Sequence, residues 1–248
     1  MRAESYDGVP APVLAERVGV PRLALYATVG SVLDVAHELA ADGAADGTLV
    51  LADRQESGRG RQGSLWASPA GTGIWLAMIR RTSAAPTNGV LALRAGLVLA
   101  EALEALGAPA RLKWPNDVLL ADGKVAGILC EARSAPDVGH WVAIGLGLNV
   151  TGAAPVPGAA VLADTVPEAD RVGVLAALVP RLASLALAGE LSGGERRAWA
   201  ARDWLRGREL LTPIAGRASG LGADGALLVD TPEGTRHILG GTVTCSSR

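Results

Sequence analysis

Apolar positions along this chain follow two periods, and the change between them predicts an alternation of helices and strands. Apolar residues recur at helical spacing in four stretches, at about residues 31–41, 88–106, 172–188 with an interruption at Pro180, and 195–204. Short apolar runs bounded by polar or glycine residues predict strands at 48–52, 74–79, 118–120, 124–131 and 141–150. Strand hairpins mixed with helices are typical of an α+β fold, in which helices flank a mixed β-sheet.

Turn signals divide the chain further. Asp122-Gly123 lies between two apolar runs and predicts a tight hairpin turn. Residues 151–168 are rich in Pro, Gly and Ala and predict a loop. From about residue 208 the pattern changes to short strands with glycine turns, which fits a small β-barrel, with strands at 226–230, 236–239 and 242–245.

The first 22 residues contain three prolines and no sustained periodicity, so we expect a flexible or loosely docked lead. A chain of 248 residues is long enough for one main domain with a small appendage. We therefore expect three parts, a lead at 1–22, a main domain at 23–205 and a small C-terminal domain at 206–248.

Composition excludes several classes of function. Hydrophobic residues make up 49% of the chain, yet no apolar run reaches the roughly 18 residues of a membrane span. The N-terminus carries Glu4 and Asp7 and has no hydrophobic signal core, so we expect a cytoplasmic protein without a membrane partner. A formal net charge of -2 argues against nucleic acid as a partner. Cys130 and Cys245 set up neither a disulfide framework nor metal-ligand spacing, and we expect both to be buried.

The stretch Glu56-Ser-Gly-Arg-Gly-Arg-Gln-Gly63 holds the first candidate chemistry. Its glycines allow close approach of the backbone to a ligand, and Arg59 and Arg61 supply forked donors for carboxylates and phosphates. Trp66 follows closely and could anchor the far end of this loop. We expect residues 57–66 to become ordered over a bound ligand.

Two further motifs follow downstream. Lys113-Trp-Pro-Asn-Asp117 ends a predicted strand, and Gly145 and Gly147 occupy alternate positions of another. Glycine weakens a strand unless a ligand or another backbone needs the space. Lys113 by itself is most simply a solvated lysine at a strand end, and the glycines are equally compatible with tight strand packing.

Taken in order, GRGRQG with Trp66, KWPND with AGIL and Glu131, and IGLGLN at 144–149 resemble biotin protein ligases, also called biotin–[acetyl-CoA-carboxylase] ligases. The resemblance is strong over residues 25–150, and Gly220–Gly241 resembles the family's small terminal domain more weakly. It implies a biotin/lipoate ligase-like catalytic domain and a C-terminal SH3-like barrel. Some members add an N-terminal DNA-binding domain, which needs upwards of about 50 residues, so we expect the monofunctional type.

The resemblance implies a two-step reaction. Biotin and ATP, with Mg²⁺, give biotinyl-adenylate and pyrophosphate, and a lysine of a biotin carboxyl carrier domain then attacks the adenylate. No nucleophile of the enzyme is needed, because the attacking amine belongs to the acceptor. The sequence does not identify metal ligands. Edge strands of the main sheet could pair between two copies of the chain, so a homodimer is one possible assembly.

The resemblance also assigns residues. The catalytic set is Lys113, Arg59 and Arg61. The implied biotin site adds polar and glycine positions at Ser31, Gln55, Gly58, Gly60, Gly127, Gly145 and Gly147. The implied ATP site consists of Arg59, Arg61, Trp66, Asn116, Lys124 and Asn149. Purely structural interpretations remain for several of these, because Asn116 and Asn149 could equally cap turns and Lys124 could face solvent.

One position departs from the family pattern. Ser-Thr-Asn is common at the start of the first helix, whereas this chain has Ser31-Val32-Leu33. Ser31 and Asp34 keep the spacing of a capping box. The loss of the hydroxyl and the amide leaves open how the ureido oxygen of biotin is bound.

Two alternative functions are compatible with parts of the sequence. A lipoate or octanoate ligase or transferase shares the fold, and the transferase would use a cysteine such as Cys130 as nucleophile. A binding module that senses biotin without turnover is compatible with Val32 and Leu33. His37 is expected to be structural or exposed, and the tryptophans at 75, 141, 199 and 204 to be packing residues. For Trp204 a place near the nucleotide is the alternative, and it is not assigned.

Overall fold

The computed structural model describes residues 1–83 and 88–246. Within them, seven strands form one sheet in the order β3-β4-β5-β9-β8-β7-β6. The strands are β3 Leu23–Val29, β4 Leu49–Gln55, β5 Gly73–Thr82, β6 Ala110–Lys113, β7 Asp117–Leu120, β8 Gly123–Ala135 and β9 Gly139–Asn149. The pair β3 and β4 is parallel, and all other neighbours are antiparallel, so the predicted mixed sheet is confirmed.

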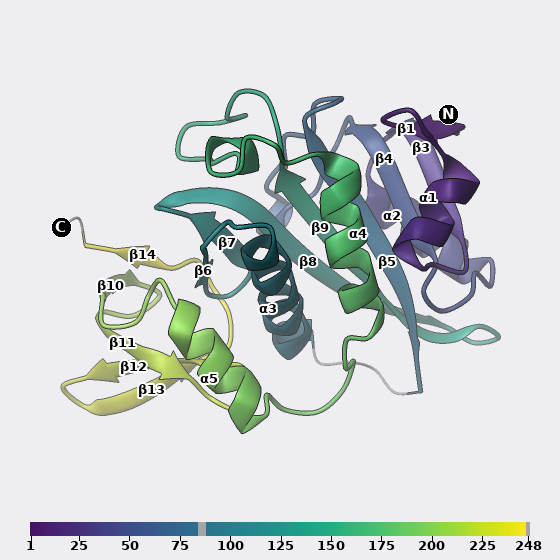
Figure 1. The fold of residues 1–248 in the computed structure, drawn as a ribbon. Helices are drawn as coiled ribbons and strands as arrows, with labels where there is room; N and C mark the ends of the chain where they lie inside the picture. Colours follow the sequence, from purple (N-terminus) through teal and green to yellow (C-terminus); the bar gives the residue numbers. More distant parts are fainter. Residues whose placement is uncertain (84–87, 247–248) are drawn as a thin grey trace.

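Helices cover both faces of this sheet. Three of them, α1 Ala11–Val18, α3 Asn88–Ala105 and α4 Arg171–Ala183, pack on one face, and α2 Val32–Ala41 packs on the other (Figure 1). A fifth helix, α5 Gly193–Arg202, lies beside the C-terminal strands. Two 3-10 turns, η1 Arg61–Gly63 and η2 Leu162–Asp164, interrupt the loops.

Strand alternation divides the apolar side chains between two cores. On β9, Ile144 and Leu148 face the large core beneath α1, α3 and α4, whereas Ala143 joins the smaller core beneath α2. Successive side chains of a strand point to opposite faces, so one strand serves both layers. The glycines predicted for a ligand floor, Gly145 and Gly147, share the parity of Ala143 and therefore belong to the α2 face.

The N-terminal segment differs from the expected flexible lead. Its residues form a small hairpin, β1 Ser5–Tyr6 with β2 Val9–Pro10, and then α1. Tyr6, Leu14 and Val18 are buried in the large core. Pro10 and Pro12 do not break the helix because they stand at its N-cap and in its first turn, where no backbone N–H is required.

Two observed helices have boundaries that differ from the predicted ones. The predicted interruption at Pro180 is wrong, because α4 continues through it and ends at Ala183, so residues 184–188 are not helical. The helix α5 begins two residues earlier than predicted, where Ser192 and Glu195 form a reciprocal capping box. The β7–β8 hairpin is confirmed, but its turn residues are Ala121 and Asp122, and Gly123 already pairs with Leu120.

The C-terminal strands form an antiparallel sheet in the order β13-β12-β11-β10-β14. They are β10 Glu209–Thr212, β11 Gly216–Leu221, β12 Leu227–Thr231, β13 Gly234–Ile238 and β14 Thr244–Cys245. Among the described residues β13 and β14 do not pair with each other, so this SH3-like unit is an open sheet instead of a closed barrel. Cys130 is buried as predicted, but Cys245, on the edge strand, is only half-buried. Residues 247–248 of the predicted unit lie outside the described residues.

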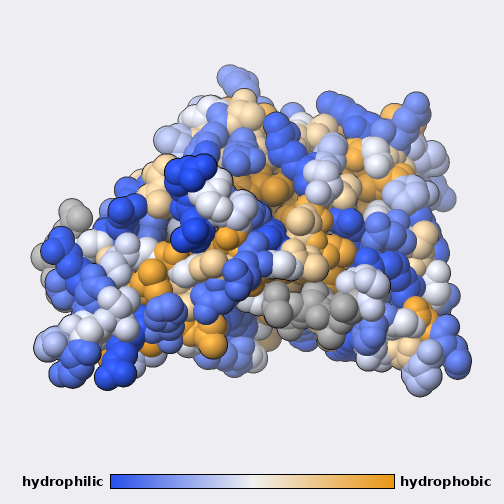
Figure 2. Space-filling view, turned by 90° about the horizontal axis from the view of Figure 1, so that it is seen from below, coloured by the Kyte–Doolittle hydropathy of each residue, from blue (hydrophilic) through white to orange (hydrophobic). Residues whose placement is uncertain are grey.

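One face of the molecule carries both polar and apolar regions. Seen from below, polar residues dominate both ends of the molecule, and apolar ones gather in the middle of this face (Figure 2). In the part of the chain that the structure describes, no helix has the length and apolarity needed to cross a membrane.

Candidate active site

A pocket of about 700 Å³ opens on the α2 face of the sheet. Segments distant in sequence meet there: the start of α2, the end of β4 with the loop after it, residues 113–129 from β6 to β8, β9, the loop at 155–159 and residues 241–243. Of the residues predicted from the sequence, all but Gly58 line it, namely Ser31, Gln55, Arg59, Gly60, Arg61, Trp66, Lys113, Asn116, Lys124, Gly127, Gly145, Gly147 and Asn149. The motifs singled out along the chain therefore converge on one cavity.

The glycine-arginine loop is folded on itself. Its ends are joined by a hydrogen bond of 2.8 Å from the Trp66 N–H to the Gly58 carbonyl, and the Gly60 N–H donates to the Ser64 carbonyl at 2.7 Å. Gly58 lies beneath this closure, where a Cβ would come within 2.5 Å of the Trp66 carbonyl oxygen. Gly63 has a φ of +76°, which side-chain-bearing residues rarely adopt. The loop therefore requires glycine for its shape.

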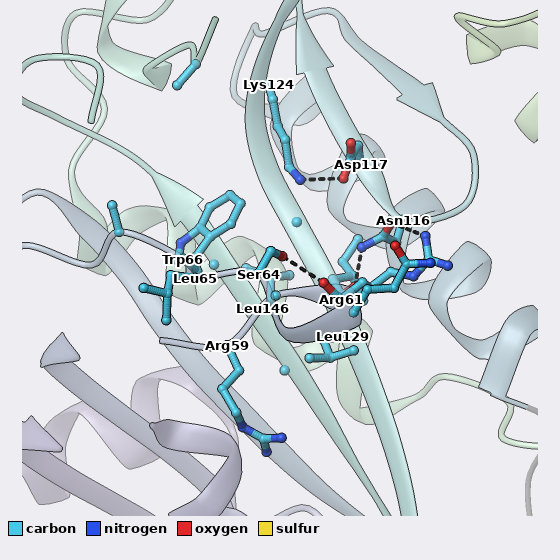
Figure 3. A pocket seen from close by; sticks show the side chains of 18 of the residues that line it. Arg59, Arg61, Ser64, Leu65, Trp66, Asn116, Asp117, Lys124, Leu129 and Leu146 are labelled. Carbon is cyan, nitrogen blue, oxygen red and sulfur yellow. Dashed lines mark hydrogen bonds and ion pairs between the residues drawn. The ribbon is translucent and has the colours of Figure 1, made fainter. Parts of the chain in front are cut away.

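Three cations of the pocket differ in how firmly they are held. Lys124 pairs with Asp117 at 2.6 Å (Figure 3). Within the part of the chain that the structure describes, Arg61 makes only long hydrogen bonds of 3.4 Å, to Asn116 Oδ1 and to the Gly241 carbonyl. Lys113 has no carboxylate partner among the described residues, and its ammonium lies 5.3 Å from the ring centroid of Trp204. The only two lysines of the chain thus both line the pocket, and one has no ion pair there.

Arg59 lies differently from Arg61. Its guanidinium forms a bidentate hydrogen-bonded pair with Glu131, at 2.8 and 2.9 Å, and an ion pair of 2.9 Å with Asp34. Figure 3 shows its side chain directed away from Arg61, Asn116 and Lys124. Asp34 therefore binds the loop instead of completing the predicted capping box, and only Ser31 caps α2.

A buried histidine, His37, forms a hydrogen bond with Glu131. The Trp141 indole N–H donates to His37 Nδ1 at 2.9 Å, and His37 Nε2 lies 2.9 Å from Glu131. An indole N–H can only donate, so Nδ1 accepts and Nε2 carries the proton. Burial lowers the pKa of His37 despite its bond to Glu131. Burial alone raises the pKa of Glu131, but the hydrogen bonds from Arg59 and His37 outweigh it and lower the pKa.

The glycine floor is covered by two side chains of the protein. A Cβ on Gly145 would lie 2.8 Å from Leu33, and one on Gly147 would lie 2.4 Å from Trp66 Nε1. Trp66 also reaches Gly127, where a Cβ would be 3.0 Å from its ring. The space left by these glycines therefore admits Leu33 and Trp66 close to the sheet, and both side chains face the pocket.

The predicted amide side chains form mostly internal bonds. Gln55 accepts from the Val32 N–H at 2.9 Å and donates to Ser68 at 2.8 Å. Asn116 and Asn149 donate to the carbonyls of Ile128 and Ala160. Among the described residues that line the pocket, Arg59 Nε is buried without a hydrogen-bond partner, and so are Asn149 Oδ1 and Trp66 Nε1, the two that belong to no ion-paired group. Unpaired buried polar atoms are costly, so these two positions favour a polar ligand.

Several residues of the site were not assigned from the sequence. Glu131 was noted in its motif without a role, and Asp34 was taken as a helix cap. Asp117 gains importance as the partner of Lys124, and Trp204 as the aromatic neighbour of Lys113. Residues 241–243 reach the pocket from the far end of the chain, which no local pattern indicates.

Cys130 does not belong to the pocket. It lies in the large core, on the face of β8 that packs against α3, and it is absent from the pocket lining. Burial raises the pKa of its thiol to about 12. A thiol of this kind is not available as a nucleophile at neutral pH.

Comparisons with known proteins agree with this arrangement. The model of the biotin/lipoate A/B protein ligase family matches residues 29–149, and that of the biotin protein ligase C terminal domain matches 209–244. The biotin--[acetyl-CoA-carboxylase] ligase of Paracoccus denitrificans is 36% identical over 216 residues, covering 80% of this chain and 90% of that protein.

Two further relatives extend the comparison. The bifunctional ligase/repressor BirA of Bacillus spizizenii is 40% identical over 124 residues, which are 49% of this chain but only 38% of that protein. The chain thus matches about two fifths of that relative's length. A biotin protein ligase from Aquifex aeolicus in complex with biotin and ATP superposes with a TM-score of 0.74 at 27% identity, covering 92% of this chain and 100% of that one.

The fold and the pocket define a protein of two parts, a mixed-sheet domain with a glycine-floored, cation-lined cavity and an appended open sheet that contributes residues 241–243 to it. Sequence similarity places this combination within one family. The chain belongs to the biotin/lipoate A/B protein ligase family.

Proposed function

We propose that this protein is an ATP-dependent biotin protein ligase. It forms biotinyl-5'-adenylate from biotin and ATP and then transfers the biotinyl group to a lysine of a biotin carboxyl carrier domain. The observation on which this proposal depends is the pocket itself. It is lined by glycines, by Lys113, which has no ion pair among the described residues, and by the weakly bonded Arg61. The relative from Aquifex aeolicus, whose fold matches over 92% of this chain, binds biotin and ATP.

The first step requires two anions to meet. A carboxylate oxygen of biotin attacks the α-phosphorus of ATP, a new C–O–P linkage forms, and the bond to the pyrophosphate oxygen breaks. Positive groups must neutralise the reactants and the developing charge. Lys113 and Arg61 are suited to this because neither gives up a strong bond to a protein carboxylate when an anion enters.

The second step requires no side-chain nucleophile from this chain. The acceptor amine attacks the carbonyl carbon of the mixed anhydride, and AMP leaves with the bonding electrons. Water must stay away from the anhydride meanwhile, and Trp66 and the loop at 57–66 lie over the pocket where they can exclude it. The burial of Cys130 in the opposite core argues against acyl transfer through a cysteine.

The chemistry of the donors accommodates magnesium bound with ATP. Among the described residues no group of three acidic, histidine or cysteine side chains could hold an ion. Mg²⁺ is commonly held by substrate phosphates, waters and one or two protein oxygens. Asn149 Oδ1, buried without a partner, and the Asp117 carboxylate are the oxygens that would serve, and the ion would screen the phosphate charge.

The exchange of labelled pyrophosphate into ATP tests the proposal. We expect exchange that depends on biotin and is absent with lipoate or octanoate. Exchange with lipoate and not biotin would replace the proposed substrate. Tight biotin binding without any exchange would instead assign the chain as a sensing module. Transfer is then checked with a biotin carboxyl carrier domain and with the same domain after its target lysine is changed to arginine.

A further inference from the structure

The two arginines of the loop have different surroundings, although the sequence presents them as a repeated pair. Arg59 makes two hydrogen bonds, of 2.8 and 2.9 Å, to Glu131 and an ion pair of 2.9 Å with Asp34. Arg61 makes two hydrogen bonds of 3.4 Å to neutral oxygens. Charge-assisted bidentate bonds are much stronger than long bonds to neutral acceptors. The two arginines therefore cannot be equally free to meet an incoming anion.

We propose that Arg59 is a positioning residue, latched by Glu131 and Asp34, which holds the 57–66 loop on the pocket and leaves Arg61 as the anion-binding arginine of that loop. The latch joins three elements, because Asp34 lies on α2, Glu131 on β8 and Arg59 on the loop. This inference deepens the proposed function and depends on it for the chemistry, but not for the contact itself.

The Glu131 carboxylate, which binds Arg59, is itself held in place by two buried residues. Trp141 on β9 orients His37, whose Nε2–H holds one oxygen of Glu131 at 2.9 Å. His37 and Trp141 are 2% and 3% exposed, so this support lies inside the core beneath α2. Because His37 orients the Glu131 carboxylate, both of its oxygens face the Arg59 guanidinium in one geometry. Neither His37 nor Trp141 lines the pocket, which is what a supporting role requires.

Release of Arg59 would be costly. Glu131, with 23% of its side chain exposed, would keep only the neutral His37 and the more distant Arg133, whose nearest nitrogen is 3.8 Å away. Removing one member of a partly buried pair leaves the other charge uncompensated. Arg61 gives up no comparable bond. An entering carboxylate or phosphate is therefore met by Arg61 and Lys113, while Arg59 stays in place.

The first experiment tests the latch without any substrate. Limited trypsin digestion is followed by mass spectrometry at the bond after Arg61, which every variant retains. We expect Glu131→Gln to increase cleavage there about tenfold, because the charge-assisted pair is lost. Asp34→Asn, an exposed position, should increase it less. The matched control is Glu104→Gln, which breaks a bidentate pair with Arg202 between α3 and α5.

The second experiment tests the consequence for the chemistry. Each variant is incubated with biotin and ATP without acceptor, and the AMP released by escape and hydrolysis of the adenylate is measured. We expect about tenfold faster release for Glu131→Gln and for Arg59→Ala, and no further increase in the double variant, because both remove one interaction. Pyrophosphate exchange should change much less in these variants than in Arg61→Ala.

The outcomes separate the two proposals. A wild-type chain without biotin-dependent exchange refutes the proposed function, whereas the digestion result still decides the latch. Equal cleavage after Arg61 in Glu131→Gln and Glu104→Gln overturns the latch, and so does a rise at all arginines together, which reports global unfolding. Faster cleavage with adenylate retained as in the wild type overturns the positioning role.

Discussion

The two faces of β9 share one backbone but differ in function: one packs in the core and the other lines the pocket. On one face Ile144 and Leu148 are fully buried in the large core. On the other, Gly145, Gly147 and Asn149 line the pocket. The core face carries large, closely packed side chains. The pocket face carries glycines and the buried Asn149, whose amide oxygen has no partner among the described residues. Stability and chemistry are thus separated by strand parity, one residue apart along the chain.

The largest effect on stability is expected from a substitution on the core face of β9. Ile144→Ala should lower the free energy of unfolding by about 2–5 kcal/mol, because a buried methyl-rich side chain is replaced by a cavity. Adenylate formation per folded molecule should be unchanged. Denaturant titration gives the stability, and exchange assays below the unfolding transition give the activity. A loss of activity with stability intact would contradict the separation of the faces.

A change on the pocket side should have the reverse profile. Lys113→Ala should reduce adenylate formation about 10²- to 10³-fold, the range for loss of a group that stabilises developing charge. The unfolding midpoint should not move, because Lys113 has no ion pair among the described residues. Exchange kinetics and thermal unfolding are measured on the same preparation. Wild-type turnover would remove Lys113 from the mechanism.

The floor can be altered by a single carbon. Gly147→Ala places a Cβ within 2.4 Å of Trp66 Nε1 and must displace that ring, at a cost of about 1–3 kcal/mol typical of overpacking. We expect weaker binding of biotin and ATP, measured by calorimetry. Gly89→Ala is the control, because its Cβ would meet nothing within 4 Å. Unchanged ligand affinity in Gly147→Ala would show that Trp66 yields freely.

The smallest effect concerns pH. The folded pKa of Glu131 is lowered, so its contribution to stability is present above its unfolded value of roughly 4.3 and is lost as the pH falls through the folded value. The stability difference between wild type and Glu131→Gln should therefore shrink below about pH 4. Denaturant titrations across about pH 3–7 measure this difference. A difference constant over that range would mean that Glu131 is not charged in the latch.

Much of the fold followed from local patterns. The strand runs at 48–52, 74–79, 124–131 and 141–150 and the helices on both sides of the sheet correspond to observed elements. The errors have local causes. Residues 1–22 were expected to be flexible or loosely docked because their prolines, placed at a helix start, resemble loop prolines. The β3 strand was not predicted as an element, and Pro180 did not interrupt α4, because packing on the sheet outweighed the lost hydrogen bond.

The motifs by themselves determined which residues meet, because glycine, arginine and lysine in this order are needed for a close backbone approach beside positive charge. Tertiary structure alone decided what each residue does there. It paired Arg59 with Glu131 and Asp34, left Arg61 with weak bonds, and brought residues 241–243 to the pocket. The physical reason is that a charged side chain is defined by its partners, and these come from strands and helices remote in sequence, which local periodicity does not specify.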